Sequence, residues 1–248
     1  MSHEALLEAT GVRKTYGEKV VLDDVDLVVR PHDVICLIGS SGSGKSTLLR
    51  CLNLLEDVDD GVIEFEGREI SDPRVDRRAV RSRMGMVFQS YNLFPHLSVL
   101  DNCTIAPRRV HGVPKAEAEQ RAHDLLTRFG LADQASKHPD RMSGGQQQRA
   151  ALVRALCTQP TLLLLDEITA ALDPELVGEV LTIVRELAEQ GTTMILATHE
   201  MAFARDIAST VCFLDQGRIL EHGSPAQMFS RPREERTRQF LARVLPQT

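Results

Sequence analysis

The sequence of 248 residues contains no tryptophan, and its five cysteines lie far apart. They are Cys36, Cys51, Cys103, Cys157 and Cys212. No C-x-x-C pair occurs, so the pattern does not suggest a zinc site or a redox couple. Cysteines in apolar surroundings are usually small buried thiols, and we expect that role here. Free thiols in turn fit a reducing compartment.

Long apolar runs and long basic runs are also missing. No stretch approaches the roughly 20 apolar residues of a membrane-spanning helix, so activity at a membrane would require docking on another protein. Residues 1–5 lack the basic flank and the apolar core of a signal peptide. With a formal net charge of −6 and no extended basic block, the sequence does not predict a nucleic-acid partner.

The central feature is an apolar strand, predicted at residues 34–38, followed by a sequence of the form G-x-x-x-x-G-K-[ST]. In such a loop the backbone N–H groups surround phosphate oxygens, the lysine reaches the terminal phosphates and the next hydroxyl holds magnesium. Leu48, Leu49, Leu52 and Leu55 then recur at helical spacing, which predicts a helix whose positive N-terminus faces the anion. A flexible linker is the alternative, but linkers are not framed by a buried strand and a helix. The predicted nucleotide loop consists of Gly39, Ser40, Ser41, Gly42, Ser43, Gly44, Lys45, Ser46 and Thr47.

Two segments near this loop alternate apolar and polar residues at period two. Residues 25–29 and 62–66 follow this pattern, and a hairpin turn is expected at residues 66–68. A small antiparallel β-layer should therefore flank the nucleotide core. Tyr16 precedes this layer, and because a lone tyrosine is usually a packed or surface side chain, the pattern alone gives it no function.

A loop rich in aromatic side chains follows a short strand predicted at residues 84–87 and Gln89. Residues 90–97 include Tyr91, Leu93 and Phe94 in a chain with only 4% aromatic residues, which favours a sticky surface, although these side chains could instead fill a local core. From residue 98 to residue 141 the periodicity is helical. We therefore expect a helical subdomain inserted between strands of the core.

The glycine-rich sequence Ser143, Gly144, Gly145 and Gln146 precedes a strong helix-forming run. A helix that begins in this way exposes several unpaired N–H groups, which makes it a second candidate anion site. One chain cannot easily present two such sites to one phosphate. The segment is therefore either an ordinary glycine-rich helix start or part of the nucleotide site of a neighbouring chain.

Two further apolar strands end in side chains that can support hydrolysis. The strand predicted at residues 161–165 is followed by Asp166 and Glu167, as expected for a parallel strand whose carboxyl end meets a ligand. Asp166 can lie near Mg²⁺, and Glu167 can orient or deprotonate the attacking water. His199 follows the strand predicted at residues 192–198, where a structural contact is the more common role of a single histidine.

Taken together and in this order, these features resemble the ATP-binding subunit of an ATP-binding cassette (ABC) transporter over almost the whole chain. Six motifs of that family are present: Walker A at residues 39–47, the Q-loop at Gln89, the signature at residues 143–146, Walker B at residues 162–167, the D-loop at residues 171–173 and the H-loop at His199. The resemblance implies an α/β fold with a P-loop NTPase core and a mainly parallel sheet, an antiparallel β-layer and an inserted helical subdomain at about residues 90–160. It also implies that residues 1–248 form one ABC ATPase domain.

The resemblance also implies ATP and Mg²⁺ as ligands and assigns roles to individual residues. Catalytic roles fall to Glu167, His199, Gln89 and Lys45, and Mg²⁺ ligation falls to Ser46, Gln89 and Asp166. Tyr16 becomes the residue expected to stack on adenine. The signature residues 143–146 and Asp173 are expected to meet the nucleotide that a second copy of the chain holds.

More narrowly, residues 92–96, 198–205 and 232–237 resemble the polar amino-acid uptake branch, close to the ATPases of histidine and glutamine importers. This implies a homodimer on the cytoplasmic face of the plasma membrane, partnered by integral permease subunits and indirectly by a solute-binding protein. An ABC ATPase for another cargo, or one not coupled to transport, such as those of DNA repair or translation, is the alternative. A P-loop phosphotransferase would have no use for residues 143–146.

The sequence departs from the family pattern at two places. Met142 stands where leucine usually begins the signature, which is a volume-conserving change. After Glu167 the family normally has proline, threonine and serine, whereas this chain has Ile168, Thr169 and Ala170. If the backbone of Ile168 has a shape that proline can adopt, Ile168→Pro should raise the melting temperature by a few degrees.

Overall fold

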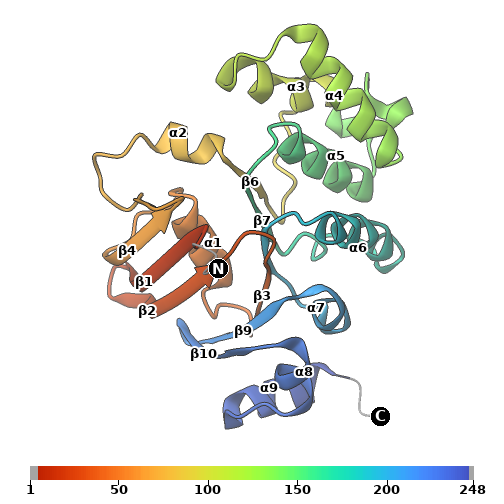
Figure 1. Cartoon of the computed structure of the whole chain (residues 1–248). Coiled ribbons are helices and arrows are strands. Elements are labelled where there is room, and N and C mark those ends of the chain that lie inside the picture. The colour runs from red at the N-terminus through yellow and green to blue at the C-terminus, as the bar shows by residue number, and fades with distance from the viewer. Residues whose placement is uncertain (1–4, 246–248) are drawn as a thin grey trace.

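The computed structural model describes residues 5–245, and Figure 1 shows two β-sheets with helices arranged around them. Residues 1–4 and 246–248 lie outside the described residues, so the predictions for the extreme ends of the chain are not addressed by the structure. Within residues 5–245, no helix is both long enough and apolar enough to cross a bilayer. All five cysteines are buried free thiols, as predicted.

A four-stranded antiparallel sheet forms the predicted β-layer. Its order is β2-β1-β4-β5, with bounds β1 Leu7–Tyr16, β2 Lys19–Val29, β4 Asp60–Phe65 and β5 Arg68–Glu69. Glu66 and Gly67 have φ values of 53° and 70°, as required in the tight hairpin turn predicted there. Sequence analysis missed β1, because the register shifts around Gly11 and breaks the period-two pattern.

A six-stranded sheet forms the centre of the molecule, in the order β10-β9-β3-β8-β7-β6. Its bounds are β3 Val34–Ile38, β6 Met84–Val87, β7 Leu162–Asp166, β8 Met194–Ala197, β9 Thr210–Asp215 and β10 Arg218–Gly223. Among the described strands of this sheet, only β10 runs antiparallel to its neighbour. This is the predicted mainly parallel core. The carboxyl ends of β3, β8, β7 and β6 consequently lie along one edge of the sheet.

The sheet is buried on both faces, which explains why its strands are continuous apolar runs. Along β3, Cys36 and Ile38 point into a core formed mostly with helices, whereas Ile35 and Leu37 point into a second core formed with the antiparallel sheet and α1. The two cores hold β3 and the loop that follows it between rigid layers.

The helices complete both layers. Their bounds are α1 Lys45–Leu52, α2 Arg77–Ser82, α3 Val99–Val110, α4 Lys115–Arg128, α5 Gly144–Leu156, α6 Pro174–Glu189, α7 Met201–Ile207, α8 Pro225–Ser230 and α9 Glu235–Val244. Two short 3₁₀ turns occupy Ala132–Gln134 and Pro139–Arg141. The helix after the phosphate loop is shorter than predicted: α1 ends at Leu52, and Leu55 lies beyond it with 47% of its surface exposed.

The chain between β6 and β7 is helical in this structure, as its periodicity predicts. Figure 1 shows α3, α4 and α5 gathered at one end of the molecule, apart from the antiparallel sheet. Ala118, Ala122 and Leu126 form the buried stripe of α4 and pack into the helical core. This group of helices carries the predicted signature at the N-terminus of α5.

Candidate nucleotide site

The loop between β3 and α1 has a backbone that requires glycine at two points. Gly39 has φ 153°, and a Cβ there would lie 2.2 Å from the carbonyl oxygen of Leu214. Gly44 has φ 110°, and its Cβ would lie 2.8 Å from the carbonyl oxygen of Val21. A Cβ on Gly42 would instead meet nothing within 4 Å, so this part of the loop faces open space. The loop is therefore packed against β2 and β9 on one side and open to a ligand on the other.

The open side of the loop suits a phosphate group. The hydroxyl of Ser43 is buried and has no hydrogen-bond partner among the described residues, which is unusual for a buried polar atom. The N-terminus of α1 begins at the same place and presents backbone N–H groups and the positive end of its dipole. The predicted phosphate loop thus has an unsatisfied donor and a favourable field for an anion.

Lys45 is nearly buried, with 3% of its surface exposed. Its ammonium donates to the carbonyl oxygens of Gly39 at 3.0 Å and Ser40 at 3.3 Å, and it lies 3.2 Å from Glu167 Oε1. Through these two hydrogen bonds the backbone of the phosphate loop bends around the Lys45 ammonium. Lys45 therefore connects the loop after β3 to the carboxylate that follows β7.

Ser46 and Asp166 form the second contact between these strands. The Ser46 hydroxyl donates to Asp166 Oδ1 at 2.6 Å, and the Asp166 side chain is almost completely buried. Burial raises the pKa of Asp166, although the bond from Ser46 opposes this effect. A hydroxyl and a carboxylate oxygen are the donors that Mg²⁺ prefers, and two protein oxygens are enough when phosphates and waters complete the shell.

Glu167 lies between Lys45 and His199. His199 Nε2 is 3.0 Å from Glu167 Oε1, and Nε2 carries the proton because a carboxylate can only accept. This hydrogen bond is the largest of the effects that lower the pKa of Glu167 to about 2. Glu167 has φ 46°, and its backbone N–H bonds to the carbonyl of Ala197 on the adjacent strand. The structure therefore gives His199 a partner that sequence alone could not identify.

The remaining predicted residues do not join this cluster. No side-chain hydrogen bond described for residues 5–245 connects Tyr16, Gln89, Ser143 or Asp173 to the phosphate loop. Gln89 follows β6 at the same edge of the sheet and is exposed. Asp173 precedes α6 and is exposed. These residues have surfaces that a ligand or a second chain can reach.

The start of α5, the predicted second anion site, has fewer unpaired N–H groups than expected. Ser143 and Gln146 form a capping box on α5: the Ser143 hydroxyl accepts from Gln146 N at 3.3 Å, and Gln146 Oε1 accepts from Ser143 N at 3.0 Å. The Gln146 N–H is therefore already satisfied. The Ser143 hydroxyl keeps its own proton, which it can donate to an anion.

Lys14 contacts the ring of Tyr16 and was not among the predicted site residues. The ammonium of Lys14 lies 5.4 Å from the centre of the Tyr16 ring, which is 46% exposed, and it also pairs with Asp59 at 3.6 Å. Residues two apart in a strand share a face, and this spacing was the available signal. A cation below an exposed ring leaves the opposite ring face available for stacking.

Comparison with known proteins identifies the family. The sequence profile of the family described as ABC transporter matches residues 22–170. The chain belongs to the ABC transporter family. It is accordingly an ABC-type ATPase with a P-loop NTPase fold, as the order of the six motifs predicts.

The relatives within the ABC transporter family match the chain over nearly its whole length. The glutamine transport ATP-binding protein GlnQ of Geobacillus stearothermophilus is 47% identical over 94% of this chain and 97% of its own length. The L-cystine transport system ATP-binding protein TcyN of Escherichia coli is 47% identical over 97% of this chain and 99% of its own length.

Two solved structures of ABC transporter components have folds similar to that of this chain. The ATP-binding cassette MJ0796, described as a dimer in a post-hydrolysis state bound to ADP and Pi, superposes with a TM-score of 0.80 at 30% identity, covering 88% of this chain and 98% of that one. The ABC transporter component cbiO1 of Clostridium perfringens has a TM-score of 0.81 at 27% identity, covering 97% of both chains.

Proposed function

We propose that this protein is the ATP-hydrolysing subunit of an importer of polar amino acids, working on the cytoplasmic face of the plasma membrane. The observation that carries the proposal is its close similarity to several amino-acid transport proteins. ATP-binding proteins named for glutamine, glutamate, cystine and general L-amino acid transport are 45–47% identical to it over at least 94% of its length.

ATP binding is supported by the loop between β3 and α1. The N–H groups of residues 39–47 and the Lys45 ammonium hold the phosphates. Tyr16 stacks on the adenine. Ser46, Asp166 and Gln89 would hold Mg²⁺, which supplies charge neutralisation at the phosphates and helps to orient them.

Hydrolysis is supported by the cluster around Glu167. The carboxylate orients the attacking water and accepts a hydrogen bond from it. His199 fixes the position of Glu167 Oε1 through the 3.0 Å contact, and Gln89 reaches the same edge of the sheet from β6. The low pKa of Glu167 keeps the side chain charged at neutral pH, so the carboxylate can accept a hydrogen bond from the attacking water in every turnover.

A second copy of the chain completes each site in this proposal. Ser143 begins α5 in the helical group, no side-chain hydrogen bond described for residues 5–245 joins it to the phosphate loop of its own chain, and its hydroxyl has a proton to donate. We assign residues 143–146 and Asp173 to the nucleotide of the partner chain. The homodimer would then enclose two ATP molecules, and closing it would drive the permease.

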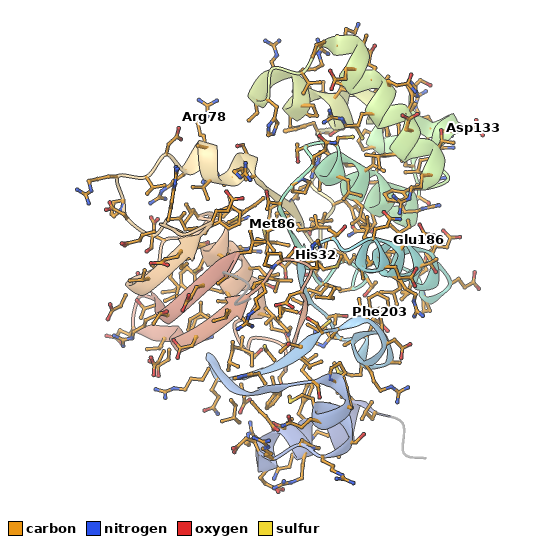
Figure 2. All side chains as sticks on the ribbon, viewed as in Figure 1. His32, Arg78, Met86, Asp133, Glu186 and Phe203 are labelled. Carbon is orange, nitrogen blue, oxygen red and sulfur yellow. The ribbon has the colours of Figure 1, made fainter. Side chains whose placement is uncertain are left out.

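A cavity of about 390 Å³ lies between α2, β6, α3 and α5 of this chain, and we propose that the permease docks there. Figure 2 marks Arg78 on α2 and Met86 on β6, two of the residues that line it. Its wall combines basic and apolar side chains, among them Arg78, Arg81, Arg154, Phe94, Ile105 and Val110. A cytoplasmic permease segment with both acidic and apolar side chains fits this lining. The solute-binding protein would act indirectly, through the permease.

Cargo specificity cannot be located in this chain, since its proposed ligands are ATP, a second copy and the permease. Transport of a different cargo is therefore the second candidate function. The structural match to cbiO1, described as part of the ABC transporter complex cbiONQ, shows that another transporter has a component of this fold. Sequence identity is much higher with the amino-acid proteins, at 47% against 27%.

The proposed enzyme mechanism is tested with two variants. Lys45→Ala should abolish ATP binding or turnover, because the ammonium stabilises phosphate charge by several kcal/mol in such sites. Glu167→Gln should keep ATP binding and lose hydrolysis, and it should accumulate as an ATP-bound dimer. ATP affinity, phosphate release and sizing with ATP and Mg²⁺ measure these effects. A monomeric Glu167→Gln chain under those conditions would contradict the shared site.

The cargo is tested by uptake. The chain should be expressed with a permease and a solute-binding protein found to bind it, and uptake of radiolabelled glutamine, glutamate, histidine and cystine should be measured in vesicles. ATP-dependent uptake of at least one of them is expected, and Glu167→Gln should abolish it. Uptake of only a metal ion or a sugar would replace the amino-acid proposal and leave the ATPase intact.

A further inference from the structure

The loop after Gln89 is attached to the helical part of the chain. Tyr91 and Asn92 both have left-handed backbones, with φ 46° and 51°, which is costly for residues other than glycine. The guanidinium of Arg154 on α5 donates to the carbonyl of Asn92 at 2.5 Å and of Tyr91 at 3.2 Å. Asn102 on α3 bonds both the N–H and the carbonyl of Phe94. The loop therefore follows α3 and α5 as one unit.

The side chain of Tyr91 leaves this unit and reaches the segment between β7 and α6. Its hydroxyl donates to the carbonyl oxygen of Ala171 at 3.1 Å. Ala171 lies two residues before Asp173, and Leu172 is between them. This is the one side-chain hydrogen bond described between residues 90–97 and residues 168–173.

The same hydroxyl lies against the start of α5. A Cβ added to Gly144 would be 2.8 Å from the Tyr91 oxygen, 3.7 Å from the ring carbon that bears it, and 3.9 Å from a methyl group of Leu172. Three segments therefore meet at one oxygen atom: the loop after Gln89, the glycine after Ser143 and the segment before Asp173.

We propose that Tyr91 is a positioning residue whose hydroxyl couples the two nucleotide sites of the dimer. The inference rests on the proposed function, in which Gln89 reads the nucleotide of its own chain while Ser143 and Asp173 meet the partner's. Tyr91 lies two residues after Gln89 and bonds the segment that ends at Asp173. A shift of the Gln89 loop thus moves the surfaces that this chain offers to its partner's ATP.

The test compares three chains in the Glu167→Gln background: the parent, Tyr91→Phe and Thr182→Val. Tyr91→Phe removes only the hydroxyl. Thr182→Val is the matched control, because it removes a hydroxyl that donates to the carbonyl of Gly178 at 2.8 Å on the exposed face of α6. Dimerisation with ATP is measured by sedimentation, and a fluorescent ATP analogue reports binding by dilute monomers.

Tyr91→Phe should raise the Kd of the ATP-bound dimer about five- to tenfold, the effect of losing one hydrogen bond inside the chain that holds the Asp173 segment in the position the partner meets. Its monomers should bind the analogue within about twofold of the parent, and Thr182→Val should match the parent in both assays. A dimer Kd unchanged by Tyr91→Phe, or a parallel loss of analogue binding, would overturn the coupling. If the parent itself fails to dimerise with ATP, the proposed shared site fails as well.

Thermal unfolding without nucleotide tests the contact independently of phosphate. Gly144→Ala should lower Tm by about 2–4 °C, because the new methyl group displaces the Tyr91 hydroxyl from Ala171. In the Tyr91→Phe background the ring carbon at 3.7 Å leaves room, so the same substitution should not lower Tm further. Equal and additive losses in the two backgrounds would contradict the three-segment contact.

Discussion

At the scale of single residues, Glu167 shows how one side chain can serve two purposes. It forms an ion pair with Lys45 at 3.2 Å and accepts a hydrogen bond from His199 at 3.0 Å. These contacts place the carboxylate at the edge of the sheet, and they also join three strands of the core. Its charge therefore contributes to stability as well as to the proposed chemistry.

Glu167→Gln should change stability in a pH-dependent way. The pKa of Glu167 is lowered from 4.5 to about 2, so its charged form is favoured by folding. That contribution is complete above pH 4.5 and is lost as the pH falls towards 2. Wild type should thus have a higher Tm than Glu167→Gln at pH 7, and the gap should shrink steadily below pH 4.5. Thermal unfolding of both chains between pH 7 and pH 3 measures this. A gap that widens in acid would contradict the assigned contacts.

Ile168→Pro should destabilise the protein, which reverses the direction expected from sequence. The Ile168 side chain is only 5% exposed and belongs to the helical core, so its removal loses buried apolar surface. Proline also forces the preceding residue towards an extended backbone, whereas Glu167 has φ 46°. We expect a loss of about 2 kcal/mol or more, or roughly 4–8 °C in Tm. Ile168→Val is the control and should cost about 1 kcal/mol. A Tm increase in Ile168→Pro would show that the exit from β7 tolerates the family's usual residue.

At the scale of elements, the aromatic loop at residues 90–97 divides into two parts. Leu93 is partly buried and packs against the helical core, and Tyr91 is partly buried and bonded to Ala171. Phe94 is 44% exposed, lies 5.9 Å from the Arg154 guanidinium and lines the cavity beside α2. The core-filling interpretation thus applies to Leu93, whereas a binding surface at Phe94 stays a prediction.

Phe94→Ala should therefore weaken docking to the permease while leaving the ATPase activity of the isolated subunit unchanged. Aromatic side chains buried at an interface commonly contribute about 2 kcal/mol, so the affinity should fall roughly 30-fold. Binding of the purified subunit to permease in detergent measures this. Leu220→Ala, which removes an apolar side chain of similar exposure on β10, is the control. Equal effects of the two substitutions would place docking elsewhere.

At the scale of the whole molecule, the proposed nucleotide site combines two surfaces that no described side-chain hydrogen bond joins within one chain. The loop after β3 and the ends of β7 and β8 form a connected cluster, whereas Ser143 caps a helix in the group formed by α3, α4 and α5. Mixing two inactive variants therefore provides a direct test of how the sites are built.

Ser143→Arg should abolish hydrolysis but keep ATP binding by isolated subunits, and Lys45→Ala should abolish both. In a mixed dimer, the loop of the Ser143→Arg chain faces the intact signature of the Lys45→Ala chain. Turnover should recover to about a quarter of the wild-type rate, because half of randomly paired dimers contain one complete site out of two. The measurement is phosphate release after mixing, with dimers confirmed by sizing. Confirmed dimers without any recovered activity would count against sites shared between chains.

The sequence by itself determined the elements whose signals are local. Continuous apolar runs identified β3, β7 and β8, since strands buried on both faces need no polar alternation. The glycines, lysine and hydroxyl of the phosphate loop were recognisable because their chemistry depends on spacing within one turn of chain. The order of motifs along the chain was also sufficient to identify the family, because order requires no coordinates.

Only the tertiary structure decided which distant residues touch. Whether His199 has a partner depends on the pairing of β7 with β8, and the contact of Tyr91 with Ala171 depends on how α5 and α6 pack. The strand β1 was not predicted because the bulge at Gly11 interrupts its period-two pattern. The Gly11 N–H donates to Asp26 on the neighbouring strand, a contact that only the structure shows. The burial of Ile168 likewise arises from helices far along the chain. These features come from contacts between residues remote in sequence, and no local pattern encodes them.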